Sequence, residues 1–187
     1  MGSTRERLLE AINGPAAGMA ASNGKAAGSS IRQLVEQLEL EHPADLERDR
    51  TLLAGVWELR WSSSTQPWLR QAPWLDNLQV LAPERGLGMN LLRLKGPLGS
   101  VAAISVVAAL DVIPPQRVSV QFKRGGWVGP RLGGKRLELL AAVRQSFPAW
   151  LDITVLDADL RICRGNAGTI FALLRRPDLS ATELLPT

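Results

Sequence analysis

The stretch that decides the fold is Trp150–Leu174, WLDITVLDADLRICRGNAGTIFALL, in which two turns separate three short apolar runs. The runs are Leu151–Leu156, Leu160–Cys163 and Thr169–Leu174. The turns contain Asp, Gly and Asn, which favour sharp reversals because Asp accepts nearby backbone N–H groups and Gly or Asn tolerates positive φ. The stretch therefore predicts consecutive antiparallel strands.

Similar runs recur upstream of this stretch. Trp57, Leu59 and Trp61 alternate with polar or charged residues, which is the period of a half-buried strand. Further runs lie at Leu78–Leu81, Leu87–Leu94, Ser100–Asp111, Val118–Phe122 and Leu137–Leu140, the last of which could equally be helical, and Gly-rich turns such as Gly125-Gly126 separate them. So many short strands without a long helix between them predict a mainly β protein, an antiparallel barrel or sandwich. A barrel of about eight strands has room inside for one small ligand.

The first fifty residues predict two short helices. Ser3 and Glu6 have the spacing of a capping box. Farther along, apolar residues recur at the period of an amphipathic helix, namely Ile31, Leu34, Val35 and Leu38. We expect a helical segment over residues 1–50, a barrel over 51–176 and a carboxy-terminal tail over 177–187.

Composition narrows the classes of function. The only histidine, His42, and the only cysteine, Cys163, lie far apart in the sequence. This pair predicts neither a metal site nor a histidine-assisted nucleophile, and we expect no catalytic residue and no cofactor. No apolar run reaches the roughly 20 residues that span a bilayer. The charged start, Met1–Glu10, is unlike a secretory signal or an acid-poor transit peptide, so we expect a cytoplasmic protein.

A basic segment is the clearest feature of the charge distribution. The chain has a net charge of +4, and Arg117–Arg136 contains six basic residues and no acidic one. Trp127 lies within it, and a tryptophan at the tip of a basic hairpin suits a membrane interface. The expected membrane contacts are Lys123, Arg124, Trp127 and Arg131. Basic and aromatic residues also occur together in single-strand binders, but two aromatics make a thin stacking platform, so we expect no nucleic acid partner.

The tryptophans of the first strand and the arginines near the carboxy terminus are the candidate ligand contacts. Trp57 and Trp61 are expected on one face of that strand, with Trp57 in the core and Trp61 either in the core or at a ligand. One of Arg175 and Arg176 could stack on Trp57. The proposed ligand-binding residues are Trp61, Trp57, Arg161 and Arg164, with the last two either pairing with nearby carboxylates or holding an anionic headgroup at the barrel mouth.

Three stretches, in order and covering nearly the whole chain, carry a resemblance to a known family. They are Leu8–Ile12 with the helix Ile31–Leu40, Leu52–Leu59 with its Gly-x-Trp and the following Ser62-Ser63-Ser64, and Trp150–Phe171. Together they resemble the plastid lipid-associated (fibrillin) family, and the third stretch is the most specific of them. The sequence departs from the family's pattern in having no tyrosine, with Val155 where an aromatic residue is usual.

The resemblance implies a lipocalin-like antiparallel β-barrel with two short amino-terminal helices. It also implies non-catalytic binding of a hydrophobic molecule (a carotenoid, a quinone or a lipid) and association with photosynthetic membranes or lipid bodies. Because the sequence begins directly at the family's first helix, the chain resembles a homologue from a free-living oxygenic phototroph. We therefore expect a protein that is peripheral on the thylakoid membrane. Two alternatives stay open: a lipocalin-like factor that attaches bilin pigment to antenna proteins, and a structural coat protein with no internal ligand.

Overall fold

The computed structural model describes residues 2–14, 24–64, 66, 69, 72, 74–96, 99, 103–133, 135–145 and 148–185. Within them lie three α-helices, α1 (Thr4–Asn13), α2 (Gly24–Glu41) and α3 (Ala181–Leu184), and the 3-10 turns η2 (Arg50–Leu53) and η4 (Pro83–Arg85). The strands are β1 (Gly55–Ser62), β2 (Leu75–Ala82), β3 (Leu87–Leu94), β4 (Ala103–Ile113), β5 (Arg117–Leu132), β6 (Lys135–Ala142), β7 (Ala149–Leu156), β8 (Leu160–Gly165) and β9 (Ile170–Arg175). Every expected strand is confirmed where it falls on described residues, including the ambiguous run in β6; the first three residues of the expected strand Ser100–Asp111 lie outside them.

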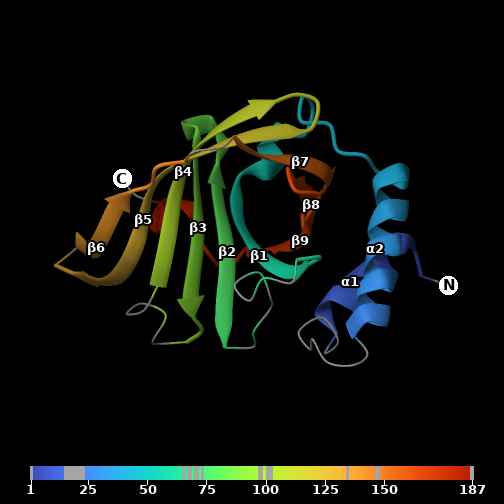
Figure 1. Cartoon of the computed structure of the whole chain (residues 1–187), viewed down its shortest axis with the longest axis horizontal. Helices are drawn as coiled ribbons and strands as arrows, with labels where there is room; N and C mark the ends of the chain where they lie inside the picture. The colour runs from blue at the N-terminus through green and yellow to red at the C-terminus, as the bar shows by residue number, and fades with distance from the viewer. Residues whose placement is uncertain are drawn as a thin grey trace.

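The strands close into an antiparallel barrel, as Figure 1 shows in a view along its opening. The sheet order is β4-β3-β2-β1-β9-β8-β7-β5-β6, and an additional β4–β5 pairing joins the two ends of an eight-stranded ring. Strand β6 stays outside that ring. It pairs with the second half of β5, whereas β7 pairs with only the first four residues of β5. The barrel is therefore closed by β7 at one end and flared by the β5–β6 hairpin at the other.

The turn expected at Gly125-Gly126 is wrong, because β5 runs straight through it. Gly125 pairs with Val106 of β4 and with Ala141 of β6. A Cβ atom at Gly126, where φ is 156°, would lie 2.1 Å from the carbonyl oxygen of Leu139. These glycines thus permit close packing of strands rather than a reversal. Trp127 consequently lies within a strand and not at a hairpin tip.

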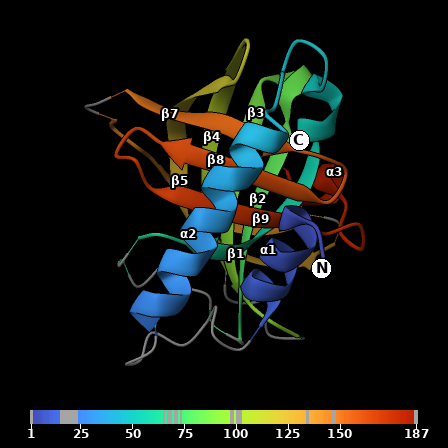
Figure 2. The same cartoon turned by 90° about the vertical axis from the view of Figure 1, so that its right-hand side faces the viewer.

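Side chains separate into one inner cluster and two outer clusters. The inner cluster contains Trp57, Leu59, Ile153, Cys163 and Leu173, which project into the barrel from four strands. One outer cluster packs α1 and α2 against β7, β8 and β9, the face that Figure 2 presents to the viewer. The other covers the outside of β2, β3 and β4. Since both helices lie outside the ring, neither of them fills its interior.

A β-bulge in β1 overturns the expectation that Trp57 and Trp61 share a face. Leu59 pairs with Leu173 of β9, but the next paired residue is Trp61 with Ala172, so Arg60 is an extra residue. One extra residue reverses the alternation of side chains. Trp61 therefore leaves the interior and packs beneath α1 and α2 with the outer cluster.

The segment expected to be a tail packs on the barrel. Leu184 and Leu185, in and just after α3, are buried against the outside of β2–β4. Arg176 anchors the start of this segment, since its guanidinium contacts Glu58 at 3.3 Å, Asp76 at 3.4 Å and Asp178 at 2.7 Å. The described carboxy-terminal residues thus belong to the folded unit.

Candidate functional site

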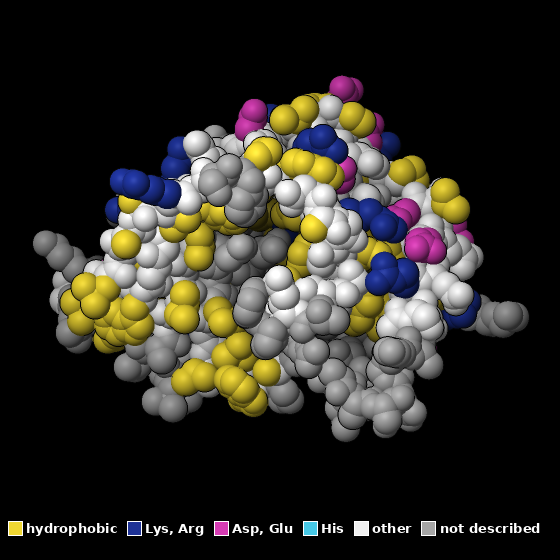
Figure 3. Space-filling view, viewed as in Figure 1, with side chains coloured by type: hydrophobic (Ala, Val, Ile, Leu, Met, Phe, Trp, Pro, Cys, Tyr) yellow, Lys and Arg dark blue, Asp and Glu magenta, His cyan; other side chains and the backbone are white. Residues whose placement is uncertain are grey.

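Among the described residues, the interior of the barrel is packed at one end, whereas apolar side chains at the other end are exposed. At the packed end, Trp57, Cys163 and Leu173 have no exposed surface. At the flared end, one row of paired residues that alternation places on the inner face contains Leu92, Ile104, Trp127 and Leu139. Ile104 is 58% exposed and Leu139 is 74% exposed. This row forms an apolar rim, and Figure 3 shows a hollow in the surface where the barrel opens.

The middle of the barrel also retains contact with solvent. Trp57 pairs with Gln79, Gln79 with Asn90, Asn90 with Val106 and Val106 with Gly125. Trp57 at the start of this row is buried, yet Gln79 and Val106 are only partly buried and Asn90 is exposed. Inner mid-strand side chains that reach solvent indicate a lumen that the described side chains leave partly unfilled.

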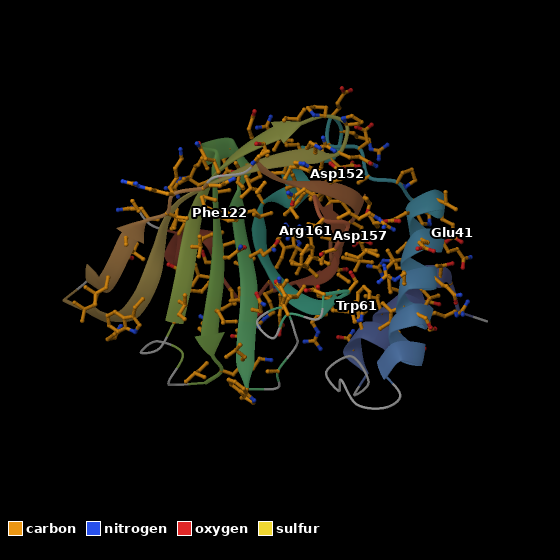
Figure 4. The ribbon with its side chains drawn as sticks, in the orientation of Figure 1. Glu41, Trp61, Phe122, Asp152, Asp157 and Arg161 are labelled. Atoms are coloured by element: carbon orange, nitrogen blue, oxygen red, sulfur yellow. The ribbon has the colours of Figure 1, made fainter. Side chains whose placement is uncertain are left out.

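Arg161 lies at the bottom of this lumen. Figure 4 places it inside the ring of strands, and its side chain has no exposed surface. One guanidinium nitrogen, Nη2, donates a hydrogen bond to Oε1 of Gln79 on β2, a strand separated from β8 by β1 and β9. The Cζ atom lies 5.1 Å from the centroid of the Trp57 ring. Arg161 therefore reaches across the lumen floor.

The charge of Arg161 is uncompensated within the described part of the chain. Its Nε is buried and has no hydrogen-bond partner, and no described carboxylate forms an ion pair with it. Burial lowers the pKa of Arg161 to about 10, so the side chain remains a cation at neutral pH. Burial also raises the pKa of the neighbouring Cys163 thiol to about 11, so that side chain supplies no negative charge. A buried cation without a partner is costly.

Arg175 closes the packed end of the barrel. Its Cζ lies 4.3 Å from the centroid of the Trp57 ring, which confirms the stacking expected for one of the two consecutive arginines. The same guanidinium donates to the carbonyl oxygens of Ala54 at 2.7 Å, Leu52 at 2.6 Å and Ala158. Trp57 is itself held by a 3.0 Å hydrogen bond from Nε1 to the Leu53 carbonyl oxygen. This arrangement is a structural plug, which leaves ligand access to the flared end.

Two of the four expected ligand-binding residues lie outside the lumen. Figure 4 shows Trp61 on the side of β1 that faces the helices. Arg164 forms a bidentate ion pair with Glu39 of α2, with contacts of 2.8 and 2.7 Å. These two side chains tie α1 and α2 to the barrel. Of the expected set, the structure brings only Trp57 and Arg161 together inside the barrel.

The expected membrane contacts are distributed along β5. Lys123 and Arg124 are exposed, and Trp127 is partly buried in the apolar rim beside Ile104 and Leu139. Arg131 belongs to β5, but its side chain lies outside the part of the structure that is described. Arg117, at the other end of the basic segment, is paired with Asp152 at 2.7 Å and lies over the Trp150 ring.

Several residues of the site were not singled out by sequence reasoning. Gln79 was missed because its partner is 82 positions away in the chain. The rim residues Leu92, Ile104 and Leu139 fall within runs expected to be strands, but the sequence pattern predicted neither their shared face nor their exposure. Only the register of β5 with its neighbours identifies them as a rim.

The described residues contain neither a metal-binding cluster nor a membrane-spanning helix. No group of three or more His, Cys, Asp or Glu side chains is arranged to hold a metal ion. None of the described helices has the length and apolar character needed to cross a bilayer.

Comparisons with known proteins show the family to which the chain belongs. The model of the PAP_fibrillin family matches residues 3–174. The chain is 27% identical to "Probable plastid-lipid-associated protein 2, chloroplastic" of Arabidopsis thaliana, covering 91% of this chain and 70% of that protein. It is 26% identical to "Light-induced protein, chloroplastic" of Solanum tuberosum, with 91% and 66% covered. It is also 26% identical to "Chromoplast-specific carotenoid-associated protein, chromoplastic" of Cucumis sativus, with 91% and 67% covered.

The chain thus spans 66–70% of the length of these three relatives. No solved structure matches the chain. The family model covers most of the sequence, and the structure is the mainly β barrel that the resemblance implied. The chain belongs to the PAP/fibrillin family of plastid lipid-associated proteins.

Proposed function

We propose that this protein is a non-catalytic carrier that holds one hydrophobic small molecule or lipid in its barrel. The observation that carries the proposal is the partial exposure of inner mid-strand residues, Gln79, Asn90 and Val106, above a fully buried floor. An unfilled lumen with an apolar rim is the kind of concave surface that small molecules occupy. The names of the relatives, which mention plastid lipid and carotenoid association, support a ligand of this class.

The driving force would be removal of apolar surface from water. Burial contributes roughly 25 cal/mol for each Å² of apolar surface. A chain-like or polyene ligand would lie against Val106 on the inner wall and against Ile104 and Trp127 of the apolar rim. The polar side chains Gln79 and Asn90 would then orient the ligand rather than supply the bulk of its binding energy.

A non-catalytic role fits the chemistry of the described lumen. Near its floor lie Arg161, which is a cation at neutral pH, and the protonated Cys163 thiol, neither of which titrates near neutral pH. General acid–base chemistry works best with a group whose pKa lies near the working pH. The names of the relatives likewise refer to association with lipid or carotenoid, not to a reaction.

We also propose peripheral contact with a lipid surface through the flared end. Ile104, Leu137 and Leu139 are exposed apolar side chains on β4 and β6. Lys123 and Arg124 of the adjoining strand β5 are exposed cations, and each cation near an anionic membrane contributes roughly 1 kcal/mol. This orientation would turn the barrel opening toward the membrane, where hydrophobic cargo resides. The names of the chloroplastic relatives make a photosynthetic membrane the proposed location.

Blocking the lumen tests the carrier function. Val106→Trp places a large side chain on the inner wall of β4, whereas Asp111→Trp places the same side chain on an exposed position of the same strand. We expect the wild-type chain and Asp111→Trp to bind retinol, a fluorescent neutral polyene, at near one molecule per chain, and Val106→Trp to lose that binding. Equal retinol binding by both variants would contradict the proposal. Absence of retinol binding in the wild type, together with vesicle binding, would favour the coat protein.

A further inference from the structure

We infer that the lumen selects amphiphiles with a carboxylate head group, which Arg161 receives at the floor of the barrel. This inference rests on the proposed function, since it names the class of ligand that the lumen takes. Arg161 is fully buried, extends from β8 across the lumen to Gln79, and has a buried Nε–H without an acceptor. The protein's own side chains thus leave a donor and a charge unsatisfied at one point.

The protein offers no partner of its own for this charge in its described residues. Other arginines around the barrel are matched: Arg164 by Glu39, Arg117 by Asp152, and Arg175 by three carbonyl oxygens. Arg161 has one neutral acceptor, the Gln79 amide oxygen, and the aromatic face of Trp57. A carboxylate would supply the missing charge and the missing acceptor together, because its two oxygens match the fork of a guanidinium.

The surroundings of Arg161 also fix how such a ligand would lie. At the packed end of the barrel, Arg175 stacks on Trp57 and, with its carbonyl partners, blocks the way past it. The open direction follows the inner wall past Val106 toward Ile104 and the rim. A carboxylate at Arg161 would therefore place an attached hydrocarbon chain along the apolar wall, with its end near the flared opening. A neutral carotenoid would leave the charge of the buried guanidinium uncompensated.

The test compares two probes that differ only in the head group, oleate and oleyl alcohol, on the full chain at pH 7.5. We expect the wild type to bind oleate roughly tenfold to a hundredfold more tightly than oleyl alcohol, as for a hydrogen bond to a charged group. Arg161→Met keeps the volume and removes the charge, so we expect it to lose this discrimination. Arg32→Met, at an exposed position of α2 outside the barrel, should keep the discrimination.

Each remaining outcome has one meaning. Equal binding of both probes by the wild type would overturn the carboxylate inference and leave the carrier function standing. Binding of neither probe, nor of retinol, would overturn the carrier function itself. Preference for oleate that survives in a folded Arg161→Met protein would place the head group elsewhere and overturn the assignment. The wild-type comparison needs no variant, so it decides the matter even if Arg161→Met fails to fold.

Discussion

Arg175 and Trp57 form the plug at the closed end of the barrel, with the Arg175 guanidinium carbon 4.3 Å from the centroid of the indole ring. The pair joins β1 to β9 and also holds the chain before β1, because Arg175 donates to the Leu52 and Ala54 carbonyl oxygens. A plug of this kind explains why the lumen can stay open at the other end without losing its packed floor.

We expect Arg175→Met to lower the free energy of unfolding by about 2–3 kcal/mol, because it removes the stacking and leaves carbonyl oxygens without donors. Urea unfolding followed by tryptophan fluorescence measures the change. The control is Arg32→Met on the exposed face of α2, which should change stability by less than about 0.5 kcal/mol. Equal stability of the two variants would show that the plug contributes little.

Trp61 offers a second test, with a tryptophan control. Because Trp61 is buried under α1 and α2, we expect Trp61→Ala to cost about 3–5 kcal/mol of stability. Trp74→Ala removes a side chain that is 62% exposed and should cost much less. Chemical denaturation measures both variants. If Trp61→Ala, while still folded, instead lost retinol binding with little loss of stability, Trp61 would be a ligand contact and its assignment to the helix interface would be wrong.

The turn between β7 and β8 should make stability depend on pH. Burial alone would raise the pKa of Asp157, but the hydrogen bonds from Arg5 and from the backbone N–H groups of Asp159 and Leu160 outweigh it and hold that pKa below its ordinary value of 3.8. A lowered folded-state pKa gives stability that is present above the unfolded pKa and is lost as pH falls through the folded pKa.

The wild type should therefore exceed Asp157→Asn in stability at pH 6, and the difference should shrink as pH falls below about 4. Unfolding in urea at a series of pH values measures this difference. Asp111→Asn, at an exposed position of β4, serves as the control and should show a smaller difference from the wild type at pH 6. A gap between wild type and Asp157→Asn that stays constant down to pH 2.5 would contradict the role assigned to the ion pair with Arg5.

The carboxy-terminal segment should contribute to stability. Leu184 and Leu185 are buried on the outside of β2–β4, so we expect the double change to Ala to cost about 3 kcal/mol or more. Leu40→Ala, at a position that is 86% exposed, is the matched control. Thermal unfolding that left the double variant as stable as Leu40→Ala would indicate a dispensable tail.

Membrane contact should depend on charge. We expect Lys123→Gln with Arg124→Gln to weaken binding to vesicles that contain anionic lipid, and to remove most of the salt dependence of that binding, because exposed cations act through screened attraction. Vesicle flotation at two salt concentrations measures the effect. Unchanged flotation would show that these two cations do not contribute to vesicle binding and would leave the apolar rim as the contact.

The sequence predicted the fold to the extent that local patterns determine it. Alternation and turn residues located every strand, since the period of two and the positions of Gly and Asp are local properties. The bulge at Arg60 could not be found this way, because it exists only in the pairing of β1 with β9. Gly125 and Gly126 were mistaken for a turn because close packing of strands and tight reversal both select glycine.

The candidate site was less predictable for a related reason. Arg161 was among the expected ligand-binding residues, but its position across the lumen from Gln79 depends on four strands coming together. Arg164, three residues later on the same strand, points to Glu39 instead. The sequence can distinguish the inward-facing arginine from the outward-facing one only when it is known which face of β8 meets α2.

Native mass spectrometry with solvent extraction, on the protein isolated gently from its own cells, tests the carrier function most directly. We expect a hydrophobic molecule at near one per chain, which is released on denaturation and is absent from the Val106→Trp protein isolated in the same way. A clean protein mass in the wild type, with nothing extracted, would contradict the account.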